Sequence, residues 1–559
     1  LSLRGGGPAT EIKELVLLDI PAPGIEVLGN VDGVPAVAGQ TFFGYEHPLA
    51  KMAVADGRLR GSYPFAGGLV CDTVLRHSVV IGVYPAGQLR RAFLYYIERE
   101  RAHPYRPFLH HNNGEDMGTY FAMRRRDPEA AARFRAGQVE WWRAMIQDVG
   151  RELVEKRGVK MDSFVHDWGW DDENLVWQFH SGFPNGFAPL RPLVDRLGAS
   201  FGIWLAPHGQ YGVSAGEAKG WAVTIPEAVG LTGAGHPALS LADEKYYAHF
   251  LASCAGMIEK YGVNYFKFDG VVKVTGNVEA LLRIMRELRK LKPDVFINPS
   301  SGTWPSPFWL RDADSTWRGG SDLGLVEKGP EGRTWLTLDG ARLGHLGIGQ
   351  RPSGPKAQKL EKGSPRQQWI TYRDYEVYNS VLGRCPLYPI SSLMIHGIAV
   401  NVGGRVKTFN QDDIVSEIRS FFATGVDHQE LFITPKLMTE RTWDVLAESA
   451  KWSRANAATL ADTHWIGGDP ANYEVYGWAS WSKNKAILSL RNPNDQPAEF
   501  AVDVGQAFEL PPGAPSSYEL KSPWKEDSAK LALHAARGHA LTIKLAPFEV
   551  IVLEAFPHS

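Results

Sequence analysis

Apolar runs and amphipathic segments alternate along most of the chain, and their order predicts the architecture. From residue 104 onwards each helical pattern is followed by a strand pattern, as in ARFRAGQVEWWRAMIQDVGRELVEKRG–MDSFVHDWGW, LRPLVDRLG–ASFGIWLAP, YYAHFLASCAGMIEKYG–VNYFKFDG and VEALLRIMRELRKLKP–DVFINPSSG. Repeated strand–helix units predict parallel strands with right-handed crossovers. Together with later strand ends in DSTWRGGSD and SSLMIHG, about eight units fit between residues 104 and 440, which predicts a (β/α)8 TIM barrel.

Short runs typical of β-strands flank this region on both sides. Residues 1–103 contain the short β-rich runs EIKELVLLDI, GIEVLGNV, GLVCDTVL and HSVVIGVYP, separated by Gly, Pro and Asp. Period-two alternation returns near the C-terminus in EVYGWASW, KAILSLRN, AEFAVDV, HALTIKL and FEVIVLEAF. We therefore predict an α/β protein of three domains: an N-terminal β-sandwich-like domain (1–103), the barrel (104–464) and a C-terminal antiparallel β-sandwich (465–559). The segment RPSGPKAQKLEKGSPRQQ (351–368) predicts an exposed loop.

Composition narrows the range of partners. The 559 residues are 44% apolar and 22% charged, and the net charge of −2 gives no reason to expect nucleic acid or a membrane as a partner. The longest apolar runs are far too short to span a bilayer. Three scattered cysteines have neither metal-ligand spacing nor a disulfide framework, so no cofactor and no metal is predicted. The chain begins with Leu1 and not with Met, which is expected either of a removed leader or of a shortened chain. A secreted or periplasmic location is predicted, and a cytoplasmic one stays open.

The stretch VNYFKFDGV (263–271) carries the first candidate chemistry. Side chains of a strand alternate between its faces, so Tyr265, Lys267 and Asp269 share one face of an otherwise apolar strand. Charges at such a place form a structural ion pair or do chemistry. In a barrel, Asp269 would lie at the carboxyl end of its strand, where barrel enzymes work.

The other predicted strand ends are also polar. Carboxylates, hydroxyls and indoles follow the strands in HDWGWDD (166–172), WLAPHGQYG (204–212), NPSSGTW (298–304), DSTWRGGSD (314–322) and LMIHG (393–397). No Cys/His cluster and no phosphate-binding glycine loop accompanies them, which makes a neutral polyol the natural ligand. Two carboxylates are what glycoside cleavage needs, one as nucleophile and one as proton donor.

Several of these motifs resemble one family. DSFVHDWGWDD, FPNGFAPLRPLVDRLGASFGIWLAP, GVNYFKFDG and STWRGGSD look like the α-galactosidase clan of retaining glycoside hydrolases, families 27 and 36, over residues 104–480. The resemblance implies that Asp269 is the nucleophile and Asp322 the general acid/base, and that Lys267 and Arg318 hold substrate hydroxyls. Lys267 is expected to keep Asp269 ionised. Asp312 and Asp314 are competing candidates for the acid/base role.

The sequence departs from the family pattern at two places. Members usually have adjacent aspartates after the second strand, whereas here Asp167 is followed by Trp168, which leaves Asp171 or Asp172 to contact the 6-position of the sugar. The loop after the fifth strand lacks the usual cysteine, and its small Ser300 and Ser301 would leave room for a 2-acetamido group.

These observations together predict a retaining exo-α-glycosidase acting on terminal α-galactosides of an oligosaccharide or glycoconjugate. The predicted substrate-binding residues are Asp167, Trp168, Asp172, Trp204, Lys267, Ser301, Trp304 and Arg318. An α-N-acetylgalactosaminidase and a raffinose-synthase-like transglycosylase remain as alternatives with the same site. More distant alternatives are a Schiff-base lyase using Lys267 and a non-catalytic carbohydrate-binding protein. A homo-oligomer is left open.

Overall fold

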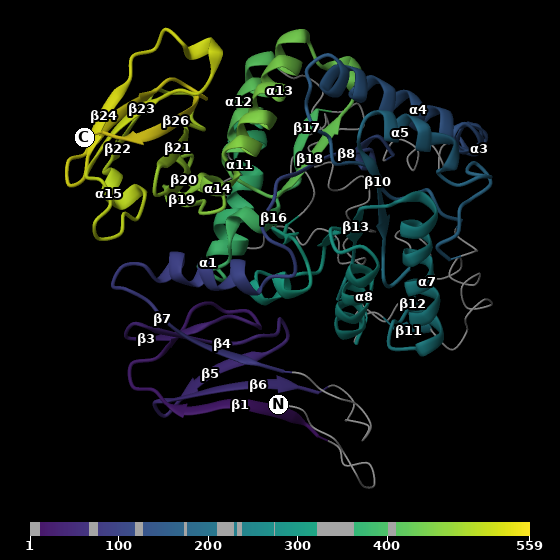
Figure 1. Cartoon of the computed structure of the whole chain (residues 1–559), viewed down its shortest axis with the longest axis horizontal. Coiled ribbons are helices and arrows are strands. Elements are labelled where there is room, and N and C mark those ends of the chain that lie inside the picture. The colour runs from purple at the N-terminus through teal and green to yellow at the C-terminus, as the bar shows by residue number, and fades with distance from the viewer. Residues whose placement is uncertain are drawn as a thin grey trace.

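The computed structural model describes residues 12–65, 77–117, 127–172, 176–209, 229–231, 237–272, 274, 276–320, 363–400 and 410–558. At its centre is a seven-stranded sheet of order β14-β13-β10-β9-β8-β18-β17, in which every neighbouring pair is parallel (Figure 1). Its strands are β8 (Phe108–Asn112), β9 (Ser163–His166), β10 (Ser200–Leu205), β13 (Tyr265–Phe268), β14 (Phe296–Pro299), β17 (Ile398–Val400) and β18 (His428–Ile433).

A second parallel pair lies between the two edges of this sheet. β15 (Thr316–Trp317) pairs with β16 (Leu393–Met394). Next to β15, Asp314 donates its N–H to Ile297 of β14, and next to β18, Asp427 donates its N–H to Ser391. The result is a TIM-barrel-like α/β fold, as predicted. The count of eight strand–helix units stays a prediction, because residues 321–362 lie outside the described part of the chain.

Helices follow the strands in the order that the sequence pattern predicts. Asp243 caps α7 by accepting from two backbone N–H groups, and Gly262 ends the helix with φ of 69°. The helices of this region are α3 (Pro128–Ala136), α4 (Gln138–Val149) with its π-helical extension η1 (Gly150–Glu155), α5 (Arg191–Arg196), α7 (Glu244–Tyr261), α8 (Asn277–Leu291), α11 (Pro365–Glu376) with the π-helical η7 (Val377–Leu382), α12 (Gln411–Ala423), α13 (Glu440–Ala455) and α14 (Ala457–Leu460). Short pieces complete it: β11 (Val229–Leu231), β12 (Pro237–Leu239) and the 3₁₀ turns η2 (Ala188–Leu190), η4 (Pro307–Arg311), η8 (Ile390–Ser392) and η9 (Pro435–Leu437). Among the helices of the described ranges, none is both long and apolar enough to cross a bilayer.

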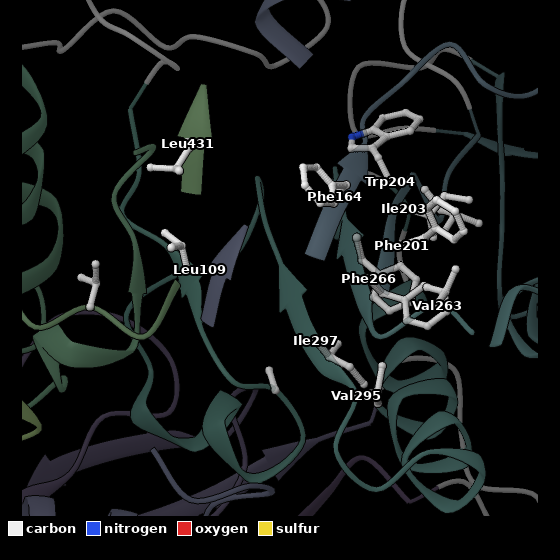
Figure 2. Packing of buried hydrophobic residues seen from close by; sticks show 14 of the residues in the cluster. Leu109, Phe164, Phe201, Ile203, Trp204, Val263, Phe266, Val295, Ile297 and Leu431 are labelled. Carbon is white, nitrogen blue, oxygen red and sulfur yellow. The ribbon is translucent and has the colours of Figure 1, made fainter. Parts of the chain in front are cut away.

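The outer faces of the strands build the main hydrophobic core. Alternate strand residues such as Leu109, Phe164, Phe201, Phe266 and Ile297 are fully or almost fully buried and belong to one cluster with the helices (Figure 2). Their neighbours in sequence carry the polar groups of the strands, so the period of two sends apolar side chains outward and polar ones inward. The polar interior of the sheet is therefore encoded strand by strand.

The N-terminal region is β-rich, as predicted. It contains the antiparallel sheets β1-β6-β5 and β2-β3-β4-β7. Their strands are β1 (Glu14–Pro21), β2 (Glu26–Val27), β3 (Ala36–Ala38), β4 (Thr41–Tyr45), β5 (Lys51–Ala55), β6 (Arg58–Pro64) and β7 (Val79–Val83). The predicted run GLVCDTVL lies outside the described residues. Helix α1 (Leu89–Glu100) was not predicted; its apolar positions Phe93, Leu94, Tyr96 and Ile97 follow the helical period and are buried.

The predicted loop 351–368 is wrong at its end. Residues 351–362 lie outside the described part, but α11 already begins at Pro365. Ser364 and Gln367 form a reciprocal capping box, in which Ser364 Oγ accepts from the Gln367 N–H and Gln367 Oε1 accepts from the Ser364 N–H. The S-P-R-Q signature was therefore a helix start that the Pro- and Lys-rich composition concealed.

The C-terminal region is antiparallel β, also as predicted. A six-stranded sheet of order β19-β20-β21-β26-β23-β24 is accompanied by the pair β22-β25. Its elements are β19 (His464–Gly467), η10 (Pro470–Asn472), β20 (Tyr476–Ser482), β21 (Lys485–Arg491), β22 (Ala498–Val502), α15 (Val504–Ala507), β23 (Ser517–Lys521), η11 (Lys525–Asp527), β24 (Leu533–Ala536), β25 (Leu541–Leu545) and β26 (Val550–Pro557).

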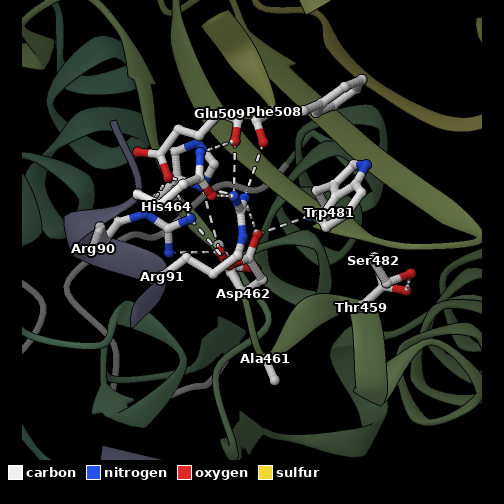
Figure 3. Close-up of polar contacts among 12 residues, drawn as sticks. Arg90, Arg91, Thr459, Ala461, Asp462, His464, Trp481, Ser482, Phe508 and Glu509 are labelled. Carbon is white, nitrogen blue, oxygen red and sulfur yellow. Dashed lines mark hydrogen bonds and ion pairs between the residues drawn. The ribbon is translucent and has the colours of Figure 1, made fainter. Parts of the chain in front are cut away.

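A cluster of charges joins the first helix to the C-terminal region (Figure 3). Arg90 and Arg91 of α1 both contact the carboxylate of Asp462, at 3.0 Å each, and Arg90 also lies 2.7 Å from Glu509. Asp462 further accepts from the backbone N–H of Trp481 in β20. Segments more than 370 residues apart are thereby held together.

Candidate active site at the carboxyl ends of the strands

The candidate site lies where β9, β10, β13 and β14 end. Lys267 of β13 is in register with Trp204 of β10 on one side and with Asn298 of β14 on the other. Asp269 follows β13 directly, and its backbone N–H donates to Leu205 of β10. Parallel pairing therefore brings the ends of three sequence motifs to one place, as the barrel hypothesis requires.

Four donors orient the Asp269 carboxylate. Oδ1 accepts from the hydroxyl of Ser301, from the Ser301 N–H at 3.1 Å and from the Gly270 N–H at 3.0 Å. Oδ2 accepts from the indole N–H of Trp204 at 3.3 Å. With three donors on Oδ1 and one on Oδ2, the second oxygen keeps accepting capacity. Asp269 is only half-buried, so this oxygen can meet a ligand.

Lys267 makes its direct ion pair with Asp167. The Lys267 Nζ lies 2.9 Å from Asp167 Oδ2, and the two side chains are 8% and 5% exposed. Burial lowers the pKa of Lys267, but the carboxylates of Asp167, Glu430 and Asp269 outweigh burial and hold this pKa well above its ordinary value. Asp167 is therefore the closest partner of Lys267, and Asp269 is a further carboxylate whose charge Lys267 feels. That Lys267 keeps Asp269 ionised stays a prediction. A protonated amine also disfavours the Schiff-base lyase hypothesis, which needs a neutral one.

An asparagine links this ion pair to a carboxylate that the sequence reasoning missed. Asn112, the last residue of β8, donates through Nδ2 to Asp167 Oδ2 at 2.9 Å and to Glu430 Oε1 at 2.7 Å. Glu430 of β18 is fully buried. Burial raises its pKa, but His428, His110 and Lys267 outweigh this and lower the pKa below the ordinary value. The signal was a carboxylate directly before the apolar run LFI (431–433).

The remaining predicted binding residues lie around this centre. The Trp168 indole N–H donates to the Gly114 carbonyl at 3.3 Å, and Asp172 lies 3.6 Å from Arg135. Trp304 donates to the carbonyl of Asp32 in the N-terminal region. Arg318 is 1% exposed and donates to the Ile395 carbonyl. Whether these four residues contact a substrate stays a prediction.

Asp322, the expected acid/base, lies outside the described residues. Its two competitors are placed, and they are not at this end of the strands. Asp312 pairs with Arg286 of α8 at 2.7 Å. Asp314 precedes β15, accepts from the Ile297 N–H and pairs with Arg289 at 2.6 Å. Both are buried structural partners of α8, so the structure removes the reason for considering them.

Sequence comparisons give no match for this chain. No protein-family model matches it, and no curated protein does. Solved structures do match in fold, at low identity.

Two similar structures are the GH36 α-galactosidase AgaB from Geobacillus stearothermophilus and the α-galactosidase from Lactobacillus brevis. AgaB is 13% identical with a TM-score of 0.54, over 98% of this chain and 75% of AgaB. The Lactobacillus brevis enzyme is 12% identical with a TM-score of 0.53, over 98% of this chain and 76% of its own. A third is the galactosidase domain of the α-galactosidase–sucrose kinase AgaSK, 13% identical with a TM-score of 0.53, over 99% of this chain and 73% of that chain. The likeness extends over all three regions of the chain. The protein therefore has the fold of GH36 α-galactosidases, which confirms the predicted structural resemblance.

Proposed function

We propose that this protein is a retaining exo-α-glycosidase that hydrolyses terminal α-galactosides, and that its eight-unit (β/α)8 barrel carries the reaction. The observation that carries the proposal is the Asp269 carboxylate, oriented by four donors at the end of β13 and half-buried beside Trp204. The fold shared with GH36 α-galactosidases supports the same reading. One of those neighbours, AgaA from Geobacillus stearothermophilus, has been solved with raffinose, which suggests oligosaccharides as the substrate class.

The geometry suggests how each group acts. Asp269 Oδ2 is the freer oxygen and would attack the anomeric carbon, while Ser301 and Gly270 hold Oδ1. The second carboxylic acid, assigned to Asp322, would protonate the leaving oxygen and then deprotonate water, so that the α-configuration is retained. The Trp204 N–H would release Oδ2 when the ester forms. It would donate to Oδ2 again when hydrolysis of the ester restores the carboxylate. The Asp167–Lys267 pair offers a carboxylate and an ammonium for sugar hydroxyls.

Two measurements test this proposal. A panel of aryl α- and β-glycosides of galactose, N-acetylgalactosamine, arabinopyranose, fucose and glucose identifies the sugar, and proton NMR of the first product identifies its anomer. We expect turnover of the α-galactoside with an α-anomeric first product. A β-anomeric first product would refute retention, and absence of turnover across the panel would refute the glycosidase assignment. Added sugar acceptors distinguish a transglycosylase.

A covalent label tests the nucleophile directly. A fluorinated galactosyl fluoride that forms a slow glycosyl-enzyme ester should add the mass of one sugar to the chain. Peptide mapping should place this mass on the peptide containing Asp269. A label on another carboxylate would reassign the nucleophile while leaving the retaining mechanism in place.

A further inference from the structure

Below the candidate active site, the interior of the sheet contains a second group of polar side chains. The alternation of β8 points Phe108, His110 and Asn112 to the same side, and the parallel register pairs Phe108 with His428 and His110 with Glu430. Phe108, Val165, Tyr265 and Phe296 form an apolar cluster inside the sheet, and Phe108, Tyr265 and Phe296 are the first residues of their strands. His110 and His428 therefore lie between an apolar floor and the charged layer that holds Asp167 and Lys267.

Three ligand-type atoms converge in this layer. One nitrogen of His110, one nitrogen of His428 and one carboxylate oxygen of Glu430 all lie within 4.8 Å of one another. Each of the three side chains is 0% exposed. His110 Nε2, His428 Nδ1 and Glu430 Oε2 have no hydrogen-bond partner in the described part of the chain. Glu430 Oε1 lies 3.6 Å from His110 Nε2, and Glu430 Oε2 lies 3.9 Å from His396 Nδ1, both beyond hydrogen-bond distance. Polar atoms buried this deeply normally have a partner, so an unpartnered atom on each of three adjacent side chains calls for a ligand.

The surrounding groups leave the right lone pairs available. His110 Nδ1 lies 3.3 Å from the Phe108 carbonyl, to which it can only donate, so a neutral His110 ring presents its lone pair at Nε2. His428 Nε2 lies 2.8 Å from the Tyr265 hydroxyl and 3.2 Å from the side-chain amide of Asn298, whose oxygen has no partner in the described part of the chain. With this amide oxygen turned toward His428, Nε2 carries the proton and the lone pair lies at Nδ1. A backbone carbonyl or hydroxyl behind a ligating imidazole is the usual outer partner in metal sites.

From these contacts we propose that His110, His428 and Glu430 bind one divalent transition-metal ion, with zinc as the expected occupant. Two imidazoles and one carboxylate form a ligand set that suits zinc. A dication is also favoured by charge, because the Lys267 ammonium faces three carboxylates, those of Asp167, Glu430 and Asp269. The ion would tie together β8, which carries His110, and its parallel neighbour β18, which carries His428 and Glu430.

The metal would act on the candidate site through one side chain. Glu430 Oε1 accepts from Asn112 Nδ2, which also donates to Asp167. An ion that fixes Glu430 would thereby fix Asn112 and the Asp167–Lys267 pair above it. The metal proposal does not depend on the proposed glycosidase activity, since its test measures binding.

The test uses the full-length protein, stripped with a chelator, incubated with zinc and desalted. We expect about one tightly held zinc per chain by elemental analysis, and a rise in Tm of at least about 2 °C on adding zinc to the stripped protein. H110Q and E430Q should each lose this zinc. H111Q is the matched control, because His111 is equally buried on β8 but contacts the Ile433 carbonyl instead of the cluster. It should keep the zinc even if it is less stable.

A measurement on the unmodified protein covers the case in which the variants do not fold. X-ray absorption of the zinc-loaded protein should show two imidazole nitrogens at about 2.0–2.1 Å. Absence of retained zinc in the wild type would overturn the proposal, as would equal zinc content in the wild type and H110Q. In that case His110 and Glu430, whose nearest atoms lie 3.6 Å apart, form a buried ion pair instead.

Discussion

At the scale of single residues, the contacts of Asp269 predict what its substitution by asparagine should do. In Asp269→Asn the side-chain oxygen can still accept from Ser301 and Gly270, so the loop should keep its shape. The amide nitrogen in place of Oδ2 cannot form a glycosyl ester, and kcat should fall by at least about 10³-fold. Steady-state kinetics on an aryl α-galactoside measure the loss. Activity within tenfold of the wild type would remove Asp269 from the reaction.

A matched control separates chemistry from stability. Asp312→Asn breaks the pair with Arg286 at the opposite end of the strands. Because Asp312 is buried, this change should lower the free energy of unfolding by about 1–3 kcal/mol and leave kcat/KM at the assay temperature within about twofold. A large loss of kcat in Asp312→Asn with an unchanged fold would restore it as an acid/base candidate.

Trp168 leads to a prediction about the sugar. Its indole N–H is already donated to the Gly114 carbonyl, and an indole cannot accept a hydrogen bond from a hydroxyl. An apolar wall discriminates weakly, whereas a site built to pair a hydroxyl rejects analogues lacking it by about 10⁴-fold or more. If Trp168 faces the 6-position, kcat/KM for aryl galactoside and its 6-deoxy counterpart should differ by less than about 100-fold. A ratio near 10⁴ would assign the 6-hydroxyl to another polar group.

At the scale of elements, helix α8 is tied to the N-terminal sheets through Glu279. Its carboxylate lies 2.8 Å from His47 Nε2 and accepts from the Tyr63 hydroxyl at 2.5 Å. Burial raises its pKa, but the contacts with His47 and Tyr63 and the charge of Arg286 outweigh burial and lower this pKa to about 2. The lowered pKa of Glu279 identifies a contact between α8 and the N-terminal sheets. The strength of this contact depends on pH.

The sign of this dependence follows from the direction of the shift. The ionised form is favoured in the folded protein, so Glu279 contributes stability that is fully present above about pH 4.5, its ordinary pKa, and is lost as pH falls towards 2. The Tm difference between the wild type and Glu279→Gln should therefore shrink as the pH falls from about 5 towards 2. Thermal unfolding of both proteins across this range measures it. A difference that grows on acidification would contradict the assignment.

Local patterns were sufficient to predict the elements that repeat the strand–helix unit. β13 ends at Phe268, and Asp269 follows it, as the alternation in VNYFKFDGV indicated. Helix α1 was missed because LRRAFLYYIERE is rich in aromatic residues that favour strands. Only packing shows that Phe93, Tyr96 and Ile97 share a buried helical face while Tyr95 is 71% exposed.

Long-range contacts of the site could not be predicted in the same way. Asn112 and Glu430 are 318 positions apart and meet only because β8 and β18 pair in parallel. Asp167 and Lys267, 100 positions apart, form an ion pair that the sequence suggested only as two separate charges. Resemblance to a family pointed to the motifs, but the partner of Lys267 follows from strand register, which no local pattern gives.

At the scale of the whole molecule, side-chain contacts connect the N-terminal region both to the barrel-like region and to the C-terminal region. Trp304, in the loop after β14, donates to the Asp32 carbonyl of the N-terminal region. Helix α1 continues from this region to the Arg90–Arg91–Asp462–Glu509 cluster beside β20. The N-terminal region thus contacts both a loop at the candidate site and the C-terminal sheet, so its removal should affect stability and activity together.

Asp462 is the residue on which this connection depends. Its side chain is 9% exposed and is shared by Arg90 and Arg91, whose side chains are 18% and 20% exposed. In Asp462→Asn both guanidinium groups lose a charged partner while still largely out of water, and Glu509 compensates only in part. The free energy of unfolding should fall by about 1–3 kcal/mol, measured by the urea midpoint, and α1 should become more sensitive to protease.

Arg441→Ala is the control: Arg441 also pairs with two carboxylates, but it is 46% exposed. Its loss should cost less than about 1 kcal/mol, because exposed ion pairs contribute little. Equal effects of the two substitutions would show that the Asp462 cluster is no more than a surface contact.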